Sequence, residues 1–414
     1  MPKLIAFRNF HYKEGKNNPK RLQQLVAPPY DVISKEEELE LKSKDPNNIC
    51  NIILPDSYTE AGKKLNQMIA DGTLMCEEDR CICIYGIDYK HPETGQEISR
   101  YGFVGLLKLV EIFPANDGVI PHEATFRKYT EDRLNLIRET DANFSPIFMI
   151  YNGNGSADKI IQKYIKREPH LQTQDRDNFT HKIWEIWKEK DIKAIQKIVQ
   201  NNPVIIADGH HRYITTLRHS RHGGCQYIMA LFIDFNDPGL IIFTSHRQVH
   251  KMPVASLFEL KQKSKHYFKI EKINNYKELK FKLEEYQQKH VFGCYFQGEF
   301  VLLTLKGEIK PEEIIMANKP DEWKQLDLPI LHKILFEKCL KINKEDISYI
   351  KDAIKGMENV NLKKVDALFI VNPTKLEDVH KITKLGEIMP QKSTYFYPKP
   401  LSGLVIHKHT DKIE

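Results

Sequence analysis

Long hydrophobic runs are missing from this chain of 414 residues. No apolar stretch approaches the roughly 20 residues that a transmembrane helix needs. The opening stretch, MPKLIAFR, lacks the apolar core of a secretory signal. Low-complexity tracts and repeats of fixed period are absent as well. We therefore expect a cytoplasmic protein with no membrane partner.

Cysteine is scarce and its spacing is uninformative. The seven cysteines, at positions 50, 76, 81, 83, 225, 294 and 339, form no Cys-x-x-Cys pair. Cys81 and Cys83 stand two residues apart in an apolar stretch, as is typical of alternate positions on a strand. We expect all seven to be reduced core thiols of an intracellular protein.

Common catalytic signatures are also missing. The chain has no Walker A loop, no GxGxxG, no kinase His-Arg-Asp and no GxSxG. His122-Glu123 is followed by Ala-Thr-Phe, so the second histidine of an HExxH zinc motif is not there. The usual nucleotide-binding folds and zinc proteases are therefore disfavoured.

The composition is that of a globular protein with a small basic excess. Hydrophobic residues make up 41% of the chain and aromatic residues 10%, which argues against disorder. Lysine and arginine number 62 against 56 acidic residues, a net charge of +6. The lysines are densest between Lys261 and Lys289, where a solvated face is the simpler interpretation than a nucleic-acid platform. We expect no nucleic-acid partner.

The length predicts two domains, and the pattern changes near residue 250. The predicted class is α+β, with antiparallel hairpins in an N-terminal region, 1–250, and a C-terminal α+β domain, 251–414. The first region has predicted hairpins at 80–89 with 98–112 and at 227–235 with 240–243, helices at 129–140 and 191–200, and a strand at 145–151. The second has predicted helices at 277–289, 329–340 and 376–383 and strands at 291–296, 301–305 and 367–371.

One short segment combines most of the groups that a phosphate site needs. An apolar strand, 204–207, runs into Asp208-Gly209, and a helical pattern then begins. A helix start presents unpaired backbone N–H groups and the positive end of the helix dipole, which suits a phosphate. Asp208 is the predicted ligand of a divalent cation. The predicted phosphate ligands are Gly209, His210, His211 and Arg212.

Two other interpretations of this segment stay open. It could be a tight turn in which Asp208 caps the helix and both histidines lie on the surface. A zinc site is less favoured, because adjacent histidines diverge on a helix, whereas metal-binding pairs are spaced four apart.

A second segment places a carboxylate before an arginine-bearing helix. His122-Glu123 lies in a loop, and Arg127, Arg133 and Arg138 follow. A carboxylate held near cations stays ionised and can act as a base, so Glu123 is the predicted base. Arg133 is predicted to bind phosphate; His122, Arg127 and Arg138 are predicted to bind substrate. A charged surface helix is the alternative, since Arg133 and Arg138 are five apart and not strictly on one face.

Three further loops complete the candidate site. The prolines of Ala27-Pro-Pro-Tyr-Asp31 hold Tyr30 and Asp31 in a fixed turn, and His246 and Arg247 follow a strand. These four side chains are predicted to contact substrate. The proline-rich loop 389–403 could close over an anion, with Lys392, Ser393 and Thr394 on the nucleotide and Lys399 nearby. Each loop could equally be purely structural.

These motifs together resemble one large family whose members were long known only as a domain of unknown function. The similarity rests on APPYD at 27–31, PHEAT at 121–125 with EDRL at 131–134, ADGHHRY at 207–213, SHR at 245–247, and MPQKST at 389–394 with Ser402-Gly403. It spans nearly the whole chain, with the motifs in the expected order.

The middle of the chain, about residues 116–235, also resembles the ParB/sulfiredoxin-like superfamily. That resemblance implies a nucleotide-binding core and is closest in function to the free serine kinases of archaea, which phosphorylate L-serine. It implies that Glu123 and Asp208 are catalytic and that the residues from Gly209 to Arg212 contact the phosphates. Sulfiredoxins need a cysteine where His210 stands, and the DNA-binding helix-turn-helix of ParB proteins is not recognisable.

We therefore expect a kinase that uses ATP, or ADP, with Mg²⁺ to convert L-serine to O-phospho-L-serine. A phosphoserine phosphatase, or reverse phosphotransfer at the same site, is the alternative among enzymes. A nucleotide-binding regulator of the ParB type is the alternative outside them. The sequence leaves open the donor nucleotide, the acceptor hydroxyl, the direction, the role of 251–414 and the oligomeric state.

Overall fold

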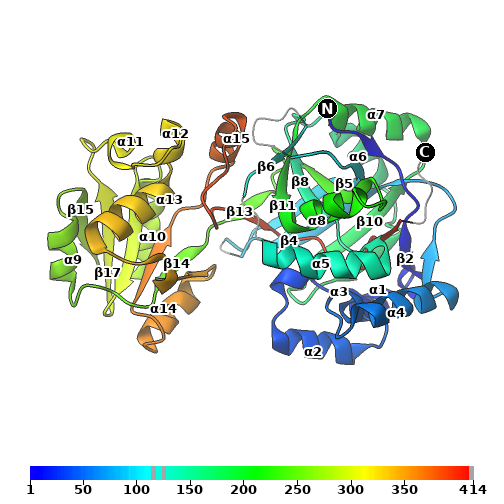
Figure 1. Cartoon of the computed structure of the whole chain (residues 1–414), viewed down its shortest axis with the longest axis horizontal. Helices are drawn as coiled ribbons and strands as arrows, with labels where there is room; N and C mark the ends of the chain where they lie inside the picture. The colour runs from blue at the N-terminus through cyan, green and yellow to red at the C-terminus, as the bar shows by residue number, and fades with distance from the viewer. Residues whose placement is uncertain (93, 113–117, 124–126, 410–414) are drawn as a thin grey trace. The chain divides into compact units, whose positions relative to one another are not determined.

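The computed structural model describes residues 1–92, 94–112, 118–123 and 127–409, without the side chains of 127–130. The chain forms two compact units (Figure 1). Unit 1 contains Met1–Ile241 and Phe396–Glu414, and unit 2 contains Ile242–Tyr395. The boundary lies close to the expected residue 250. The end of the chain, however, returns to unit 1, so the expected C-terminal domain, 251–414, differs from unit 2 at both limits.

A mixed sheet of nine strands forms the framework of the described part of unit 1. Its order is β6-β11-β8-β12-β5-β4-β10-β9, with β1 beside β5. The pairs β6/β11 and β8/β12 are parallel and the other pairs are antiparallel. The strands are β1 (Leu4–Ile5), β4 (Ile82–Lys90), β5 (Glu97–Lys108), β6 (Val119–Pro121), β8 (Ile147–Tyr151), β9 (Leu171–Gln174), β10 (Thr180–Ile186), β11 (Val204–Asp208) and β12 (Tyr227–Asp234). Two short pairs accompany it, β2 (Phe10–Tyr12) with β3 (Leu74–Cys76) and β7 (Ala142–Asn143) with β21 (His407–Lys408).

Helices pack around this sheet. They are α1 (Pro19–Leu25), α2 (Lys35–Lys44), α3 (Cys50–Ile53), α4 (Tyr58–Ala70), α5 (Arg127–Thr140), α6 (Asp158–Tyr164), α7 (Glu189–Gln200) and α8 (His210–Ser220), with the short turns η1 (Lys13–Gly15) and η2 (Tyr30–Val32). Helix α5 packs against α4 and α8 (Figure 1). The predicted apolar stripe of α5, Leu134 and Ile137, is buried. Strand β8 is buried along its whole length, as expected for a central strand.

Unit 2 contains a six-stranded antiparallel sheet in the order β15-β17-β16-β19-β14-β18. Its strands are β14 (His246–Val249), β15 (Phe268–Ile273), β16 (Val291–Phe296), β17 (Glu299–Leu305), β18 (Ile347–Ile350) and β19 (Ala367–Val371). Its helices are α9 (Leu257–Ser264), α10 (Tyr276–Glu285), α11 (Pro311–Ile314), α12 (Asp321–Lys324), α13 (Asp327–Pro329), α14 (Ala353–Asn361) and α15 (Leu376–Lys384), with a π-type segment η3 (Ile330–Leu340) and a turn η4 (Lys344–Asp346). The chain passes between the units through β13 (Ile241–Phe243) and β20 (Tyr395–Tyr397), which pair.

The class is mixed α and β, in agreement with the α+β prediction. The first predicted hairpin is confirmed, since β4 and β5 pair antiparallel from Cys83 opposite Val104 to Lys90 opposite Glu97. The second is wrong: β12 pairs with β5 and β8, whereas β13 pairs with β20. The short apolar run at 240–243 is compatible with any antiparallel neighbour, and its partner comes from far along the chain.

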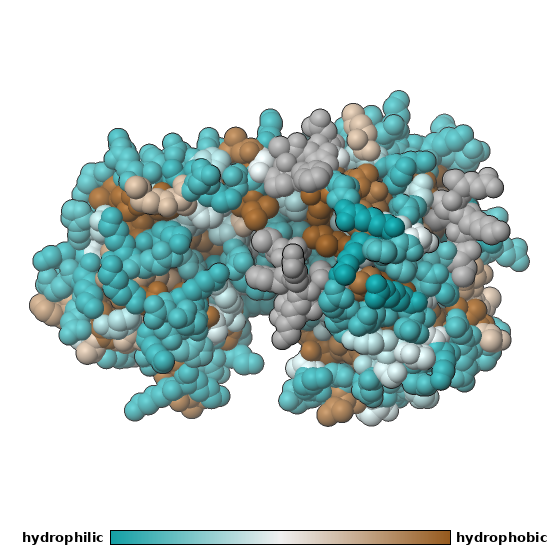
Figure 2. Space-filling view, viewed as in Figure 1, coloured by the Kyte–Doolittle hydropathy of each residue, from teal (hydrophilic) through white to brown (hydrophobic). Residues whose placement is uncertain are grey.

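The surface is mostly hydrophilic, as the composition of a globular protein predicts. Figure 2 shows hydrophilic residues over most of the visible face, with hydrophobic residues in small groups. Among the described helices, none is long and apolar enough to cross a membrane. Five of the seven cysteines are buried, whereas Cys76 is exposed and Cys225 partly exposed. The expectation that all seven lie in the core is therefore wrong for two.

Candidate functional site

The parallel pairing of β6 with β11 brings the two main sequence motifs together. Val119 lies opposite Val204, and Pro121 opposite Ile206. Parallel strands end at the same edge of a sheet, so the His122-Glu123 loop leaves β6 where β11 ends at Asp208. The register of β11 shifts between Ile206 and Asp208, and such bulges re-aim side chains beside functional sites.

His122 joins the two segments through hydrogen bonds. Its Nδ1 lies 2.5 Å from the Ile206 carbonyl oxygen, which can only accept, so Nδ1 carries a proton. Its backbone N–H donates to Nε2 of His210 at 3.3 Å, and the two rings meet edge to face. Burial lowers the pKa of both histidines, although the charges of Glu123 and Asp208 oppose this at His122. Both rings are therefore neutral at pH 7.

Gly209 permits the sharp transition from β11 into α8. Its φ of +95° is left-handed, a conformation that glycine adopts without steric cost. A Cβ there would lie 2.9 Å from Nη2 of Arg212 and 2.9 Å from Cδ1 of Ile147. No side chain caps the start of α8. The helix therefore begins with backbone N–H groups that have no partner within it.

Asp208 lies between two cationic side chains. Its Oδ1 is 2.7 Å from Nζ of Lys399, and its Oδ2 is 3.3 Å from Nη2 of Arg212. Lys399 also contacts Oδ2 of Asp31 at 2.6 Å, so one ammonium group bridges two carboxylates. Burial alone would raise the pKa of Asp208, but the charges of Lys399 and Arg212 outweigh it and hold the pKa below its ordinary value. Asp208 is therefore ionised.

Arg212 is fixed by the chain that enters β8. Its Nη1 donates to the Ser145 carbonyl at 2.9 Å, to Ser145 Oγ at 3.0 Å and to the Pro146 carbonyl at 3.1 Å. The side chain is 15% exposed. These three hydrogen bonds hold the Arg212 guanidinium in a fixed position beside Asp208.

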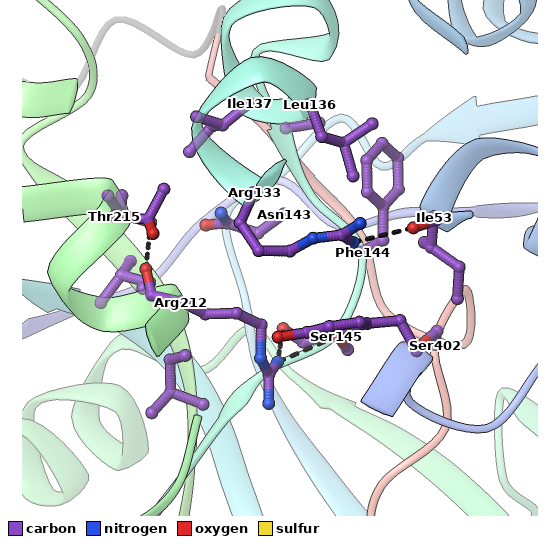
Figure 3. A pocket seen from close by; sticks show the side chains of 15 residues that line it. Ile53, Arg133, Leu136, Ile137, Asn143, Phe144, Ser145, Arg212, Thr215 and Ser402 are labelled. Carbon is purple, nitrogen blue, oxygen red and sulfur yellow. Dashed lines mark hydrogen bonds between the residues drawn. The ribbon is translucent and has the colours of Figure 1, made fainter. Parts of the chain in front are cut away.

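A cavity of about 60 Å³ lies beside Arg212. Arg133 extends from α5 and Arg212 from α8 along its wall (Figure 3). Besides these two and Tyr30, its lining includes Asn143, Ser145, Thr215, Thr216 and Ser402. A water needs about 10–15 Å³ of such space, so the cavity accommodates a few waters or one small anionic group.

Arg133 is likewise held in place. It donates to the Ile53 carbonyl at 2.8 Å and pairs with Asp132 at 2.6 Å. Its guanidinium lies 4.1 Å from the centre of the Tyr30 ring, a cation–π contact. Burial raises the pKa of Tyr30, against the charges of Arg212 and Arg133. The structure thus brings Tyr30, Arg133 and Arg212 to one cavity.

The segment that carries Lys399 is anchored by a buried arginine that sequence reasoning missed. Arg100, on β5, is 1% exposed and donates to the carbonyls of Tyr397 at 2.8 Å and Pro398 at 2.6 Å. Its guanidinium also lies 4.9 Å from the centre of the Phe148 ring. Burial lowers the pKa of Arg100 to about 10, which keeps it charged at pH 7. Its position on a plain alternating strand gave no sequence signal.

Other predicted residues lie in different surroundings. Glu123 and His211 are partly exposed and adjoin His122 and His210 along the chain. Arg138 is exposed and is not part of the cavity lining, so the structure does not bring it together with Arg133. Arg127 begins α5, and its side chain lies outside the described residues.

The remaining predicted residues belong to unit 2 and form a group of their own. Arg247 is buried and donates from Nε to Nε2 of His332 at 3.3 Å and from Nη2 to the Lys392 carbonyl at 3.3 Å. Thr374 donates to the Ser393 carbonyl at 2.8 Å. The ring nitrogen Nδ1 of His246 accepts from the Val371 N–H at 3.3 Å. Roles for His246, Arg247, Lys392, Ser393 and Thr394 in binding substrate or nucleotide stay predictions.

The fold and the site describe a mixed α/β protein with ionised groups gathered at one sheet edge. The chain belongs to the family described as "Protein of unknown function (DUF1015)", whose model matches residues 4–328. No curated protein matches it.

Solved structures with low identity show a partial likeness. A conserved hypothetical protein from Pyrococcus furiosus is 14% identical over 69% of this chain and 88% of its own, with a TM-score of 0.33. A free serine kinase in complex with AMP is 13% identical over 70% of this chain and 92% of its own, with a TM-score of 0.33. SbnI with a C-terminal truncation, from Staphylococcus aureus, is 13% identical over 73% of this chain and 86% of its own, with a TM-score of 0.36.

Proposed function

We propose that this protein is a phosphotransferase that moves the terminal phosphate of ATP, or of ADP, to the hydroxyl of free L-serine. The observation that carries the proposal is the pairing of β6 with β11, which sets the Glu123 loop beside Asp208 and the start of α8. Phosphoryl transfer needs charge neutralisation and in-line positioning more than covalent chemistry. The fixed cations near this edge support the first of these needs.

The phosphate side of the proposed site is the start of α8 with Arg212 and Arg133. Two guanidinium groups on the wall of one small cavity would bind a phosphate oxygen or a carboxylate by charge-assisted hydrogen bonds. The N–H groups of residues 210–212 add the positive end of the helix dipole. The His210 side chain would not contact the phosphate directly, because its Nε2 accepts a hydrogen bond from the His122 backbone N–H.

The acceptor side is assigned to Glu123. In the proposed step the serine hydroxyl gives its proton to the Glu123 carboxylate while its oxygen bonds to the terminal phosphorus. The bond from that phosphorus to the bridging oxygen breaks, and the shortened nucleotide leaves with the electron pair. The motif resemblance to free serine kinases assigns the same role to this glutamate. Its partial exposure suits a group that meets a diffusing substrate.

Mg²⁺ would neutralise charge on the transferred phosphate, and Asp208 remains its predicted protein ligand. Both oxygens of Asp208 already contact cations, Lys399 and Arg212. A metal ion at this carboxylate would compete with these two cations for the same negative charge, so no step above depends on such contact. In the present arrangement Asp208 positions Lys399 and Arg212.

The test is a product search with the intact chain. Mg-ATP and Mg-ADP are each incubated with the protein and a panel of amino acids and polyols, and phosphorylated products are identified by mass spectrometry. The proposal predicts O-phospho-L-serine together with the shortened nucleotide in equal amounts. Phosphate release from phosphoserine without any transfer from nucleotide would favour the phosphatase alternative. Absence of phosphorylated acceptors across the whole panel would overturn the proposal.

A further inference from the structure

Two cysteines and a glutamate meet in the interior of unit 1 at a place that the proposed site does not use. Cys81 forms an isolated bridge with Phe7, and Cys83, on β4, lies opposite Glu185 on β10. The two thiols are 0% exposed and Glu185 is 3% exposed. One ligand atom from each of the three residues lies within 4.8 Å of the others.

The spacing of the two sulfurs fits a shared metal ion. Their Sγ atoms are 3.7 Å apart, far beyond a disulfide bond of about 2.05 Å. Two sulfurs bound to one tetrahedral zinc ion at about 2.3 Å would be about 3.8 Å apart. The side chains alternate along β4, so Cys81 and Cys83 point to one face. The backbone therefore already holds the pair at a chelating separation.

Glu185 supplies an independent indication of a ligand. Its Oε1 accepts a hydrogen bond from Asn9 Nδ2 at 3.1 Å. Its Oε2 is buried and has no hydrogen-bond partner among the described residues. An unpaired buried carboxylate oxygen is costly and calls for an explanation such as an ion.

His170 belongs to the surroundings of the cluster and is not one of its ligands. Its Nδ1 accepts from the Glu185 backbone N–H at 3.2 Å, and its Nε2 is 3.9 Å from Oε2. In the neutral ring the second nitrogen then carries the proton, which excludes it as a metal ligand. The His170 side chain is 28% exposed.

We propose that Cys81, Cys83 and Glu185 bind one thiophilic divalent cation of the zinc class. Thiolates select zinc and copper(I), and the carboxylate oxygen favours zinc of the two. Both thiols lose their protons on binding. The ion would tie β4 to β10 and to the segment of Phe7 and Asn9. This site shares no residue with the proposed phosphotransfer site and does not depend on it.

Cobalt(II) provides a direct probe. The full-length protein is stripped of metal by a chelator and titrated with Co²⁺. We expect a thiolate-to-cobalt charge-transfer band that saturates at one ion per chain and is abolished by added Zn²⁺. The band should be lost in Cys81→Ala and in Cys83→Ala. It should persist in Cys50→Ala, a matched control because Cys50 is a buried free thiol of the same unit.

Glu185→Gln keeps the side-chain size and tests the site without removing a thiol. It should weaken Co²⁺ binding, and Zn²⁺ should raise the thermal midpoint of the wild type but not of this variant. Asn9→Ala removes the hydrogen bond to Oε1 and the one that Asn9 Oδ1 accepts from the Ile406 N–H, and outer-shell losses typically lower metal affinity about 10–100-fold. Unaltered Co²⁺ affinity in Glu185→Gln would overturn the assignment. So would a stripped wild type without a charge-transfer band, or a band that survives in both cysteine variants.

Discussion

Nζ of Lys399 lies 2.7 Å from Oδ1 of Asp208, although almost half of the chain separates the two residues in sequence. The contact links the C-terminal return segment to the end of β11. It also explains why Asp208 is ionised despite burial.

Removing Lys399 should destabilise the fold and reduce its acid sensitivity. Lys399→Met leaves Asp208 with Arg212 alone, and a buried group that loses a partner costs about 1–3 kcal/mol. The folded pKa of Asp208 is below its unfolded value, so its stabilisation is present above the unfolded pKa of about 3.9. It is lost as pH falls through the folded pKa. Urea unfolding across acidic pH should show a shallower loss of stability in Lys399→Met.

The control for this prediction is Lys193→Met, which removes a lysine from an exposed ion pair with Glu189. Exposed pairs contribute little to stability, so this variant should follow the wild type closely. Equal acid sensitivity in Lys399→Met and wild type would contradict the account of Asp208.

Arg100 should position the Lys399 segment. Arg100→Met loses the hydrogen bonds to Tyr397 and Pro398 and should cost about 1.5–3 kcal/mol for a bond to a charged group. Hydrogen exchange of the amides in 396–400 should become faster. Arg100→Lys keeps the positive charge but not the forked geometry of the guanidinium. It should therefore restore stability and slow hydrogen exchange only in part. Complete rescue by lysine would show that charge alone matters.

Gly209 should be required for the start of α8. Gly209→Ala forces a non-glycine residue into φ +95° and brings its Cβ within 2.9 Å of the Arg212 guanidinium. Gly223 also has a left-handed φ, of +89°, but a Cβ on this residue would have no neighbour within 4 Å. Gly223→Ala thus measures the backbone cost alone, about 1–2 kcal/mol. Nucleotide affinity, measured by calorimetry, should fall in Gly209→Ala and stay unchanged in Gly223→Ala. Equal affinities in the two variants would argue against the phosphate assignment.

The neutral histidine pair should make stability fall below neutral pH. His122 and His210 have folded pKa values below the usual value, so the unfolded chain binds more protons once pH falls below about 6.5. The free energy of unfolding should therefore decrease as the pH falls below about 6.5. In His210→Gln one fewer proton should be taken up on unfolding. The slope of the unfolding free energy against pH should therefore be smaller by about 1.4 kcal/mol per pH unit. Urea midpoints at several pH values measure this, with the exposed His222→Gln as control; identical slopes would refute the assignment.

The sequence predicted the strands and helices of the site better than the long-range contacts between them. The predicted strand 204–207 and the predicted helix start at His210 agree with β11 and α8, because a short apolar run ends in Asp-Gly there. The β4/β5 hairpin follows from alternating strands around a turn. The sequence predicted that loop 389–403 belongs to the site. It did not predict that Lys399 pairs with Asp208, because that contact depends on how the C-terminal segment returns to unit 1.

Arg100 illustrates the same limit for a single side chain. Its charge predicts exposure, whereas in the structure the carbonyls of Tyr397 and Pro398 accept its hydrogen bonds in the interior. Glu185 is a second case, because its importance depends on a cross-strand neighbour, Cys83. Pairing across a sheet is not encoded in local sequence pattern.

The central claim is that Glu123 activates the acceptor hydroxyl. Glu123→Gln keeps shape and removes charge, and loss of a general base typically lowers the rate about 10²–10⁴-fold. The control is Glu131→Gln, since Glu131 is exposed and pairs with Arg218 on the surface. The measurement is the rate of O-phospho-L-serine formation at saturating nucleotide, with nucleotide affinity determined in parallel. The account predicts a slow Glu123→Gln with near-normal nucleotide affinity and an unchanged Glu131→Gln. A wild-type rate in Glu123→Gln would contradict it.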